Sequence, residues 1–315
     1  MPSSSATVLS IGECMVELAR GADGRFSLAY GGDTFNTAVY LARAGISVGY
    51  ATRLGDDPYS GGIIALAEAE AVDTRFVTRV AGRNAGLYLI ETTPGGERSF
   101  HYWRERAPAR ELFDGDDATT LKEAMARAGI VYFSGITLSL YTDAGLDRFA
   151  DALHHERSSG ARIVMDGNFR PRGWDGGSTS GLERARAVFA RFLRLSDIAL
   201  PTLEDEHMLW GRAGASAVAR RIADLGVREI ALKMGADGGL LLVDGKETVV
   251  PCPAVVDAVD TTAAGDSFNA GYVAARLNGA SPAEAALAGH RIAAVVIQHR
   301  GAVVPKSATD AVFGA

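Results

Sequence analysis

This 315-residue chain lacks the features that mark several common classes of protein. It has two cysteines, Cys14 and Cys252, with no CxxC pair and no histidines at metal-ligand spacing. This argues against a disulfide framework or a zinc site, and we expect two free thiols in a reducing compartment. No apolar run approaches the roughly 20 residues of a membrane span, and the first residues do not resemble a signal peptide. We therefore expect a cytoplasmic protein with no membrane partner.

Nucleotide-binding loops of the best-known kinds are also missing. The chain has no GxxxxGK[ST] motif, which excludes the P-loop NTPases, and no GxGxxG follows its first apolar run, which argues against a dinucleotide-dependent oxidoreductase. The net charge is −6 and no block of Lys and Arg occurs. We therefore expect no nucleic-acid partner, whereas a small anionic substrate would require a local cationic pocket.

The chain does contain enough apolar residues, 47%, for a large core, and its short apolar runs alternate with helical patterns. The predicted strands are 8–11, 130–133, 162–165, 198–200, 229–233 and 240–243. The predicted helices are 36–44, 59–69, 118–128, 144–157, 182–195, 215–225, 268–277 and 282–299. Strands separated by helices indicate an α/β fold with a mostly parallel sheet covered on both faces. No linker or repeat divides residues 1–315, so we predict a single domain.

Two stretches, at approximately 13–33 and 85–110, interrupt this alternation and read as β-hairpins that together form a small lid. Because successive strand side chains point to opposite faces, Phe100, Tyr102 and Arg104 should share one face. A three-residue turn at 94–96 would also place Tyr88 opposite Tyr102. Two phenols and a guanidinium suit a polyol that carries a carboxylate. An amphipathic ribbon with an exposed arginine and no role in binding explains the same pattern.

The segment 260–268, DTTAAGDSF, places small residues before a helical run. Backbone N–H groups at a helix start attract an anion, and Asp266 beside them is suited to take a proton from a hydroxyl group. That pairing is typical of a small-molecule kinase. The alternative is structural, because aspartate is also a common N-cap.

Four further polar turns carry candidate site residues, and each has a structural alternative. Segment 31–36, GGDTFN, offers Asp33 and Asn36 to sugar hydroxyls, or is a plain turn with Asp33 or Thr34 as N-cap. Segment 166–170 follows a strand and presents Arg170 to phosphate or carboxylate, or is a strand-end turn. Acids in 201–206 suit water-mediated Mg²⁺, or an acidic helix start. Glycines in 233–239 suit a nucleotide or a tight hairpin.

Two of these regions resemble the ribokinase, or PfkB, family of carbohydrate kinases. The first runs from the glycine pair of 31–36 through LARAG at 41–45 to LGDDPY at 54–59, and the second is 260–268. The likeness extends from about Val8 to about Pro305. It implies a ribokinase-like three-layer α/β/α domain with a small β-sheet lid, and phosphoryl transfer from ATP with Mg²⁺. A monovalent cation remains open as a further cofactor.

Within the family, five short segments are most similar to the branch that acts on 2-keto-3-deoxygluconate. They are IGECM at 11–15, GDT at 32–34, GLY at 86–88, HYWR at 101–104 and NFRP at 168–171. The resemblance implies phosphorylation of the terminal hydroxyl of this sugar acid, giving the 6-phosphate. It also implies a homo-oligomer formed through the lid.

The resemblance assigns roles to particular residues. It makes Asp266 the catalytic base and the amides of Ala263, Ala264 and Gly265 the anion hole. It places the substrate among Gly32, Asp33, Asn36, Tyr88, Tyr102, Arg104, Arg170 and Asp266. It places the nucleotide near Asn168, Arg170, Gly235, Gly238 and the amides of 263–265. It places a water-mediated Mg²⁺ near Asp205.

The chain departs from the family pattern at two points. Ala263 stands where glycine is usual, so the anion hole survives only if its backbone angles suit alanine. Thr202 and Asp205 stand where many relatives carry Asn-x-x-Glu, which weakens the metal assignment. The alternatives are another kinase of the same family (a fructokinase, a ribokinase or a ketogluconate kinase), a non-catalytic sugar sensor and an oxidoreductase.

Overall fold

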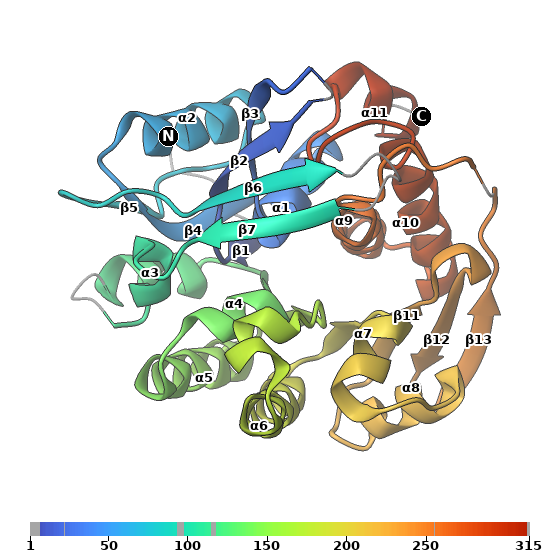
Figure 1. The fold of residues 1–315 in the computed structure, drawn as a ribbon. Coiled ribbons are helices and arrows are strands. Elements are labelled where there is room, and N and C mark those ends of the chain that lie inside the picture. The colour runs from blue at the N-terminus through green and yellow to red at the C-terminus, as the bar shows by residue number, and fades with distance from the viewer. Residues whose placement is uncertain (1–6, 22, 93–97, 115–117, 255, 314–315) are drawn as a thin grey trace, which may run out of the picture.

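A nine-stranded sheet forms the centre of the molecule (Figure 1). The computed structural model describes residues 7–21, 23–92, 98–114, 118–254 and 256–313. The strand order is β13-β12-β11-β10-β9-β8-β1-β4-β5. Strands from β5 to β11 run parallel, and β12 and β13 are added antiparallel at one edge. The parallel sheet that the alternating pattern predicts is therefore confirmed.

The strands are β1 (Val8–Ile11), β2 (Met15–Arg20), β3 (Phe26–Gly31), β4 (Val48–Gly55), β5 (Val77–Val80), β6 (Leu87–Thr92), β7 (Arg98–Trp103), β8 (Ile130–Ser134), β9 (Arg162–Asp166), β10 (Ile198–Leu200), β11 (Glu229–Lys233), β12 (Gly239–Val243) and β13 (Lys246–Val250). The helices are α1 (Asp33–Arg43), α2 (Pro58–Ala69), α3 (Ala118–Ala126), α4 (Gly135–Leu140), α5 (Asp143–Ser158), α6 (Thr179–Leu195), α7 (Leu203–Trp210), α8 (Ala215–Ala223), α9 (Ala264–Leu277), α10 (Pro282–Val296) and α11 (Lys306–Phe313).

Helices cover both faces of the large sheet, which explains why its strands are apolar throughout. In β8, Val131 and Phe133 pack against the layer that contains α3 to α8. Ile130 and Tyr132 point the other way, toward α1, α2, α9, α10 and α11. Because side chains on both faces are buried, the strands read as continuous apolar runs and not as alternating patterns. Within the described residues, no helix has the length and apolar content that crossing a membrane requires.

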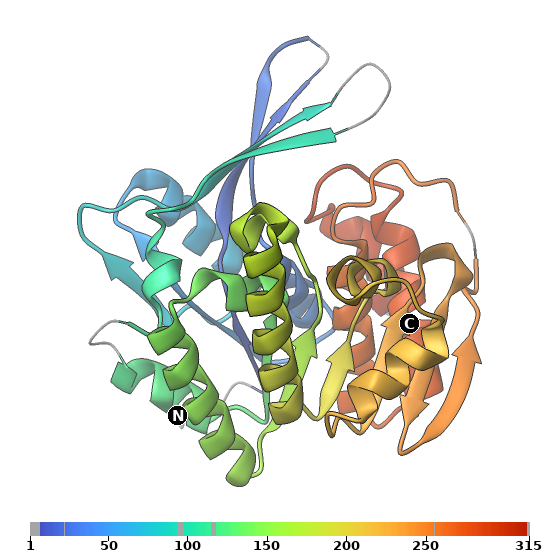
Figure 2. The ribbon, with the colours of Figure 1, turned by 60° about the horizontal axis from the view of Figure 1, so that its bottom comes forward.

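A second, four-stranded sheet projects from the main body (Figure 2), in the order β3-β2-β6-β7. Two antiparallel hairpins, β2–β3 and β6–β7, are joined along the parallel pair β2–β6. Tyr88 lies opposite Tyr102, as the alternation predicts. Tyr88, Phe100 and Tyr102 cluster on the inner face, whereas Trp103 is 57% exposed on the other. The turn expected at 94–96 lies outside the described residues.

Several local expectations are wrong. Helix α1 begins at Asp33 with Gly32 as its N-cap, and no side chain caps it, so the alternative that made Asp33 or Thr34 the N-cap is wrong. The stretch 170–181 is rich in Gly, Arg and Ser, a composition that predicts a loop, but it contains two short 3-10 turns and the start of α6. Strands β4, β5 and β13 and helices α4, α7 and α11 are absent from the sequence-based prediction. In β13, Lys246 and Glu247 on an edge strand obscure the apolar pattern.

Candidate active site

A cavity of about 820 Å³ opens at the edge where the parallel strands end. Ligands of parallel α/β folds bind at this edge, because the loops after the strands converge there. The lining includes nine of the candidate residues: Asp33, Tyr102, Asn168, Arg170, Asp205, Ala263, Ala264, Gly265 and Asp266. It also includes residues to which the sequence assigns no role: Phe100, Ile136, Asp166, Thr202, Lys233 and 258–262.

Helix α9 points its N-terminus into this cavity. Its N-cap is Ala263, which adopts a left-handed backbone conformation with φ 60° and ψ 14°. The amide of Ala264 donates to the carbonyl of Thr261 at 3.2 Å, whereas the amides of Ala263 and Gly265 have no acceptor among the described residues. Amides of this kind at a helix start form a ready anion site.

Asp266 lies in the first turn of α9 and is not its N-cap, so the structural alternative for this residue is wrong. Its Oδ2 accepts a hydrogen bond from Asn36 Nδ2 at 2.8 Å. Burial, together with the nearby charge of Asp33, raises the pKa of Asp266 to about 8. A carboxylate with a pKa near neutrality is well matched to accepting a proton from an alcohol.

Two further pairs bring distant segments together in the cavity. Asn168 Nδ2 donates to Asp33 Oδ2 at 2.8 Å, and burial raises the pKa of Asp33. Lys233, at the end of β11, donates to Asp166 Oδ1 at 3.0 Å and to Asn269 Oδ1 at 2.9 Å. The sequence assigns no role to Asp166 or Lys233. The sequence contains one feature that could have indicated a role for them. Each is a polar residue at the end of an apolar strand, at the edge of the sheet where ligands bind.

Arg170 and Asp205, assigned separately to phosphate and metal, form an ion pair. Arg170 donates to Asp205 Oδ1 at 3.0 Å, and its side chain is 54% exposed. Burial raises the pKa of Asp205, and Arg170 partly offsets this. The acidic first turn of α7, which was the alternative for this segment, is also present.

The donor set fits a magnesium ion held mainly through water. Mg²⁺ prefers oxygen ligands, keeps several waters and needs only one or two carboxylates beside substrate phosphates. Asp166 and Asp205 supply such carboxylates in the cavity. Among the residues that the structure describes, no group of three or more His, Cys, Asp or Glu is placed to hold a metal directly.

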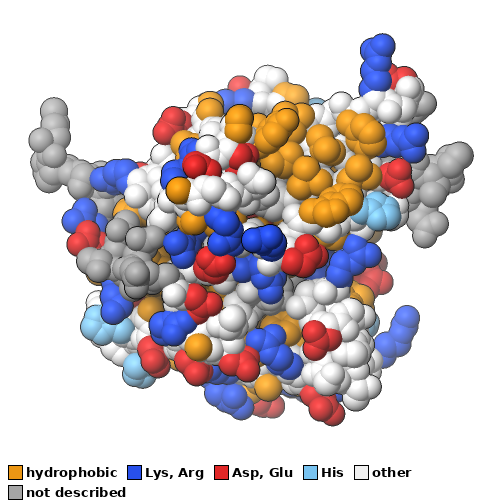
Figure 3. All heavy atoms as spheres, turned by 60° about the vertical axis from the view of Figure 1, so that its left-hand side comes forward, with side chains coloured by type: hydrophobic (Ala, Val, Ile, Leu, Met, Phe, Trp, Pro, Cys, Tyr) orange, Lys and Arg blue, Asp and Glu red, His pale blue; other side chains and the backbone are white. Residues whose placement is uncertain are grey.

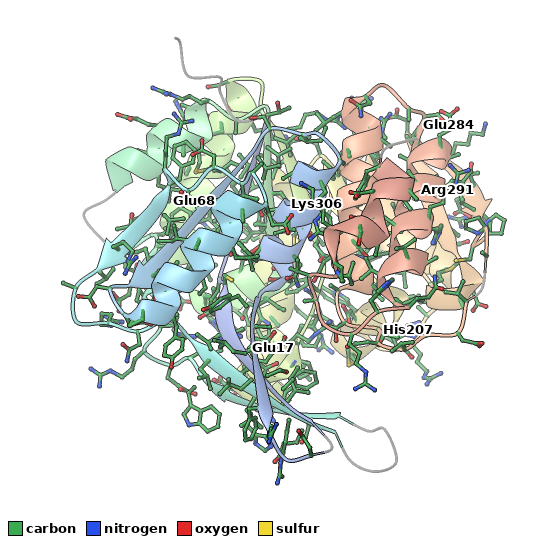
Figure 4. All side chains as sticks on the ribbon, turned by 90° about the horizontal axis from the view of Figure 1, so that it is seen from above. Glu17, Glu68, His207, Glu284, Arg291 and Lys306 are labelled. Carbon is green, nitrogen blue, oxygen red and sulfur yellow. The ribbon has the colours of Figure 1, made fainter. Side chains whose placement is uncertain are left out.

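The remaining substrate candidates lie around the cavity without lining it. Arg104 is paired with the buried carboxylate of Glu13, so its charge is already partly satisfied. Tyr88 donates its hydroxyl hydrogen to Glu17, which Figure 4 labels where the small sheet meets the main body. Packing alone explains why residue 32 is glycine, because a Cβ there would lie 2.0 Å from the carbonyl oxygen of Glu13.

The two glycines assigned to the nucleotide, Gly235 and Gly238, belong to the tight turn between β11 and β12, as the hairpin alternative predicts. Both have positive φ, and a Cβ on Gly238 would lie 2.3 Å from the carbonyl oxygen of Val250. The turn therefore requires these glycines for its own geometry. Neither residue lines the cavity.

Comparisons with known proteins define the class. The model of the pfkB family of carbohydrate kinases matches residues 5–309, so the chain belongs to this family. A 2-dehydro-3-deoxygluconokinase from Dickeya dadantii is 40% identical over 98% of this chain and 100% of its own length. The structure of a 2-dehydro-3-deoxygluconokinase from Thermotoga maritima, 20% identical, covers 98% of both chains with a TM-score of 0.81. An E. coli structure described as a ribokinase II with ATP and Mg²⁺, 21% identical, covers 94% of both with the same TM-score, 0.81.

The strained N-cap of α9 gives a stability prediction. A left-handed backbone costs an L-residue roughly 1–2 kcal/mol, and glycine avoids most of this. We expect Ala263→Gly to raise the free energy of unfolding by about 1 kcal/mol, measured by urea denaturation. Ala71, with the same φ of 60° after helix α2, is the matched control, and Ala71→Gly should give a similar gain. A gain for Ala71→Gly with none for Ala263→Gly would contradict the described conformation of the helix start.

Proposed function

We propose that this chain is an ATP-dependent sugar-acid kinase that phosphorylates 2-keto-3-deoxygluconate (2-dehydro-3-deoxygluconate) at its terminal hydroxyl to give the 6-phosphate. One observation carries the proposal: a buried carboxylate, Asp266, shares a cavity with the amides at the start of α9. The near-full-length relative with 40% identity supports the choice of substrate. The chain works as one kinase domain, 1–315, with the small sheet as its lid.

Asp266 is the base in this mechanism. It accepts the proton as the hydroxyl oxygen forms a bond to the γ-phosphorus, while the bond from that phosphorus to ADP breaks. The amides of 263–265 donate hydrogen bonds to the phosphoryl oxygens. Asp166 and Asp205 would hold a magnesium ion through water, and that ion would offset the negative charge of the phosphates.

The sugar acid lies between the lid and α1 in this proposal. Asp33 and Asn36, with the backbone of Gly32, face its hydroxyls, and Tyr88 and Tyr102 of the lid close over it. Arg104, with Arg170, orients its carboxylate. Asn168, Arg170, Gly235 and Gly238 lie on the nucleotide side. Closure of the lid excludes water, which would otherwise compete as the acceptor.

The pairing of Arg104 with Glu13 favours a second candidate, a kinase of a neutral sugar such as fructose or ribose. If Arg104 stays paired with Glu13, its guanidinium group does not need a carboxylate of the substrate as a partner. An enzyme of the first kind must instead share Arg104 between Glu13 and the substrate, which its several N–H donors allow.

Measuring ADP release over a panel of keto-acids, aldonic acids and neutral ketoses separates the two candidates. We expect 2-keto-3-deoxygluconate to give the highest kcat/KM. Arg104→Ala should raise KM for this acid far more than for ATP, because only the acid loses a charged partner. Turnover of fructose or ribose above that of every acid would reject the proposal, as would an equal effect of Arg104→Ala on both substrates.

The role of Asp266 predicts a pH dependence. With a pKa of about 8, the base is protonated at lower pH, so kcat/KM should fall as the pH drops below 8. Asp266→Asn should lower kcat by about 10²–10⁴-fold at pH 8.5 and abolish this limb. Near-normal turnover of the variant would remove Asp266 from the mechanism.

The same substitution should stabilise the fold. Burial raises the folded-state pKa of Asp266 above the unfolded value of about 4, so stability is lost as the pH rises from about 4 to 8. Asparagine carries no charge at any of these values. Asp266→Asn should therefore exceed the natural protein in Tm by more at pH 9 than at pH 5. An equal difference at both values would show that the carboxylate is not held in its neutral form.

We further propose that the protein acts in the cytoplasm as a homo-oligomer formed through the outer face of the lid. This face carries Phe26 and Leu28, each 49% exposed, and Trp103. Figure 3 shows hydrophobic side chains gathered on one side of the molecule. Contiguous apolar patches of this kind mark association surfaces, because their burial is favourable.

The oligomer proposal predicts a single-residue effect. Leu28→Glu places a charge in the contact, so light scattering after size exclusion should show a dimer for the natural protein and a monomer for the variant. Val249 on β13, 63% exposed, is the matched control, and Val249→Glu should stay dimeric. A natural protein that is monomeric at about 50 µM, well above the Kd of a stable dimer, would reject the proposal.

A further inference from the structure

Lys233 is a buried cation that the mechanism so far does not use. It ends β11, lines the cavity and is 7% exposed. Its ammonium group has three N–H donors, of which two are directed at Asp166 and Asn269. For the third donor, no acceptor is found among the described residues.

The position of this ammonium group relates it to the anion site. A Cβ built on Gly265 would lie 3.6 Å from Lys233 Nζ, so the charge lies beside the first turn of α9. Among the described residues that line the cavity, the only other cation is Arg170, which is half-exposed and paired with Asp205. Lys233 is therefore the more deeply buried of the two, and a charge acts more strongly where water is excluded.

The surrounding carboxylates create a need for such a charge. Asp33, Asp166, Asp205, Asp260 and Asp266 all line the cavity, and in their charged forms they repel an incoming phosphoryl group. The amides of α9 supply partial charges only. A fixed ammonium group beside them compensates the negative charge that accumulates in phosphoryl transfer.

We propose that Lys233 is a further catalytic residue, which directs its remaining N–H at an oxygen of the phosphoryl group passing from ATP to the sugar. The inference rests on the proposed kinase function. Lys233 keeps its proton throughout. The hydroxyl proton goes to Asp266, the new O–P bond forms at the sugar, and the electron pair of the broken bond stays on ADP.

A purely structural role is the competing explanation. Through Asp166 and Asn269, Lys233 joins the ends of β9 and β11 to α9, and Asn269 continues the contact by donating to the Tyr132 hydroxyl at 3.0 Å. Removing a structural link lowers stability, whereas removing a catalytic charge lowers kcat in molecules that remain folded.

The test compares Lys233→Met, which removes the charge, with Asn269→Ala, which breaks the link but keeps the charge. We expect Lys233→Met to lower kcat by about 10²-fold or more while the sugar acid, titrated calorimetrically, binds within about threefold of the natural affinity. Asn269→Ala should lose less than about tenfold in kcat.

Chemical rescue provides a second readout. In Lys233→Ala, added propylammonium should restore at least about tenfold in rate. Equal kinetic losses for Lys233→Met and Asn269→Ala, with no rescue of Lys233→Ala, would overturn the proposal.

Two further measurements keep the inference separate from the proposed function. If the natural protein releases no ADP with any sugar, the proposed function fails, and nucleotide binding then tests Lys233. Its contact with the terminal phosphoryl group predicts that Lys233→Met weakens MgATP binding at least about tenfold and leaves MgADP binding unchanged. Unchanged MgATP binding in Lys233→Met would overturn the role proposed for Lys233. If Lys233→Met does not fold, Lys233→Gln, which keeps a donor toward Asp166 without charge, takes its place in both assays.

Discussion

Repulsion among carboxylates at one edge of the sheet is the constraint on which this site depends. Asp33, Asp166, Asp205, Asp260 and Asp266 line a single cavity. Burial raises the pKa of Asp33, Asp205 and Asp266, which disfavours their charged forms. Several polar features of the site offset the repulsion among these acids. Asparagines donate to Asp33 and Asp266, and Lys233 and Arg170 pair with Asp166 and Asp205. Asp260 accepts from the backbone amides of Thr262 and Gly301, and the start of α9 adds its own amides. In the proposed kinase, these contacts would allow the pocket to accept phosphates despite its many acids.

Much of the fold follows from patterns that are local in the sequence. Strands buried on both faces, such as β8 and β9, read as short apolar runs, and the alternation in 98–104 gives the inner and outer faces of β7 correctly. The misses also have local causes. Arg53 interrupts β4, and the charged residues of β13 lie at an edge exposed to water. Tertiary pairing, which local patterns do not report, stabilises these strands.

The site was only partly predictable, because its contacts join segments far apart in the chain. The sequence identifies Asp266 and the helix start, but Asn36 lies 230 positions away and Lys233 meets Asp166 across 67 positions. A lysine that ends an apolar strand has no local signature of function. The pairing of Arg104 with Glu13 was unpredictable for a similar reason, since a shared face in a hairpin does not specify the partner of a charged side chain.

The way the small sheet is attached has a mechanical consequence. Strand β3 ends at Gly31, a single residue before α1 begins, and α1 carries both Asp33 and Asn36, the hydrogen-bond partner of Asp266. Strand β2 follows β1 after only three intervening residues, 12–14. Such short connections transmit displacement instead of absorbing it. A ligand that tilted the sheet would therefore also shift the environment of Asp266. In the proposed kinase, these short connections would link capture of the sugar to the state of the base.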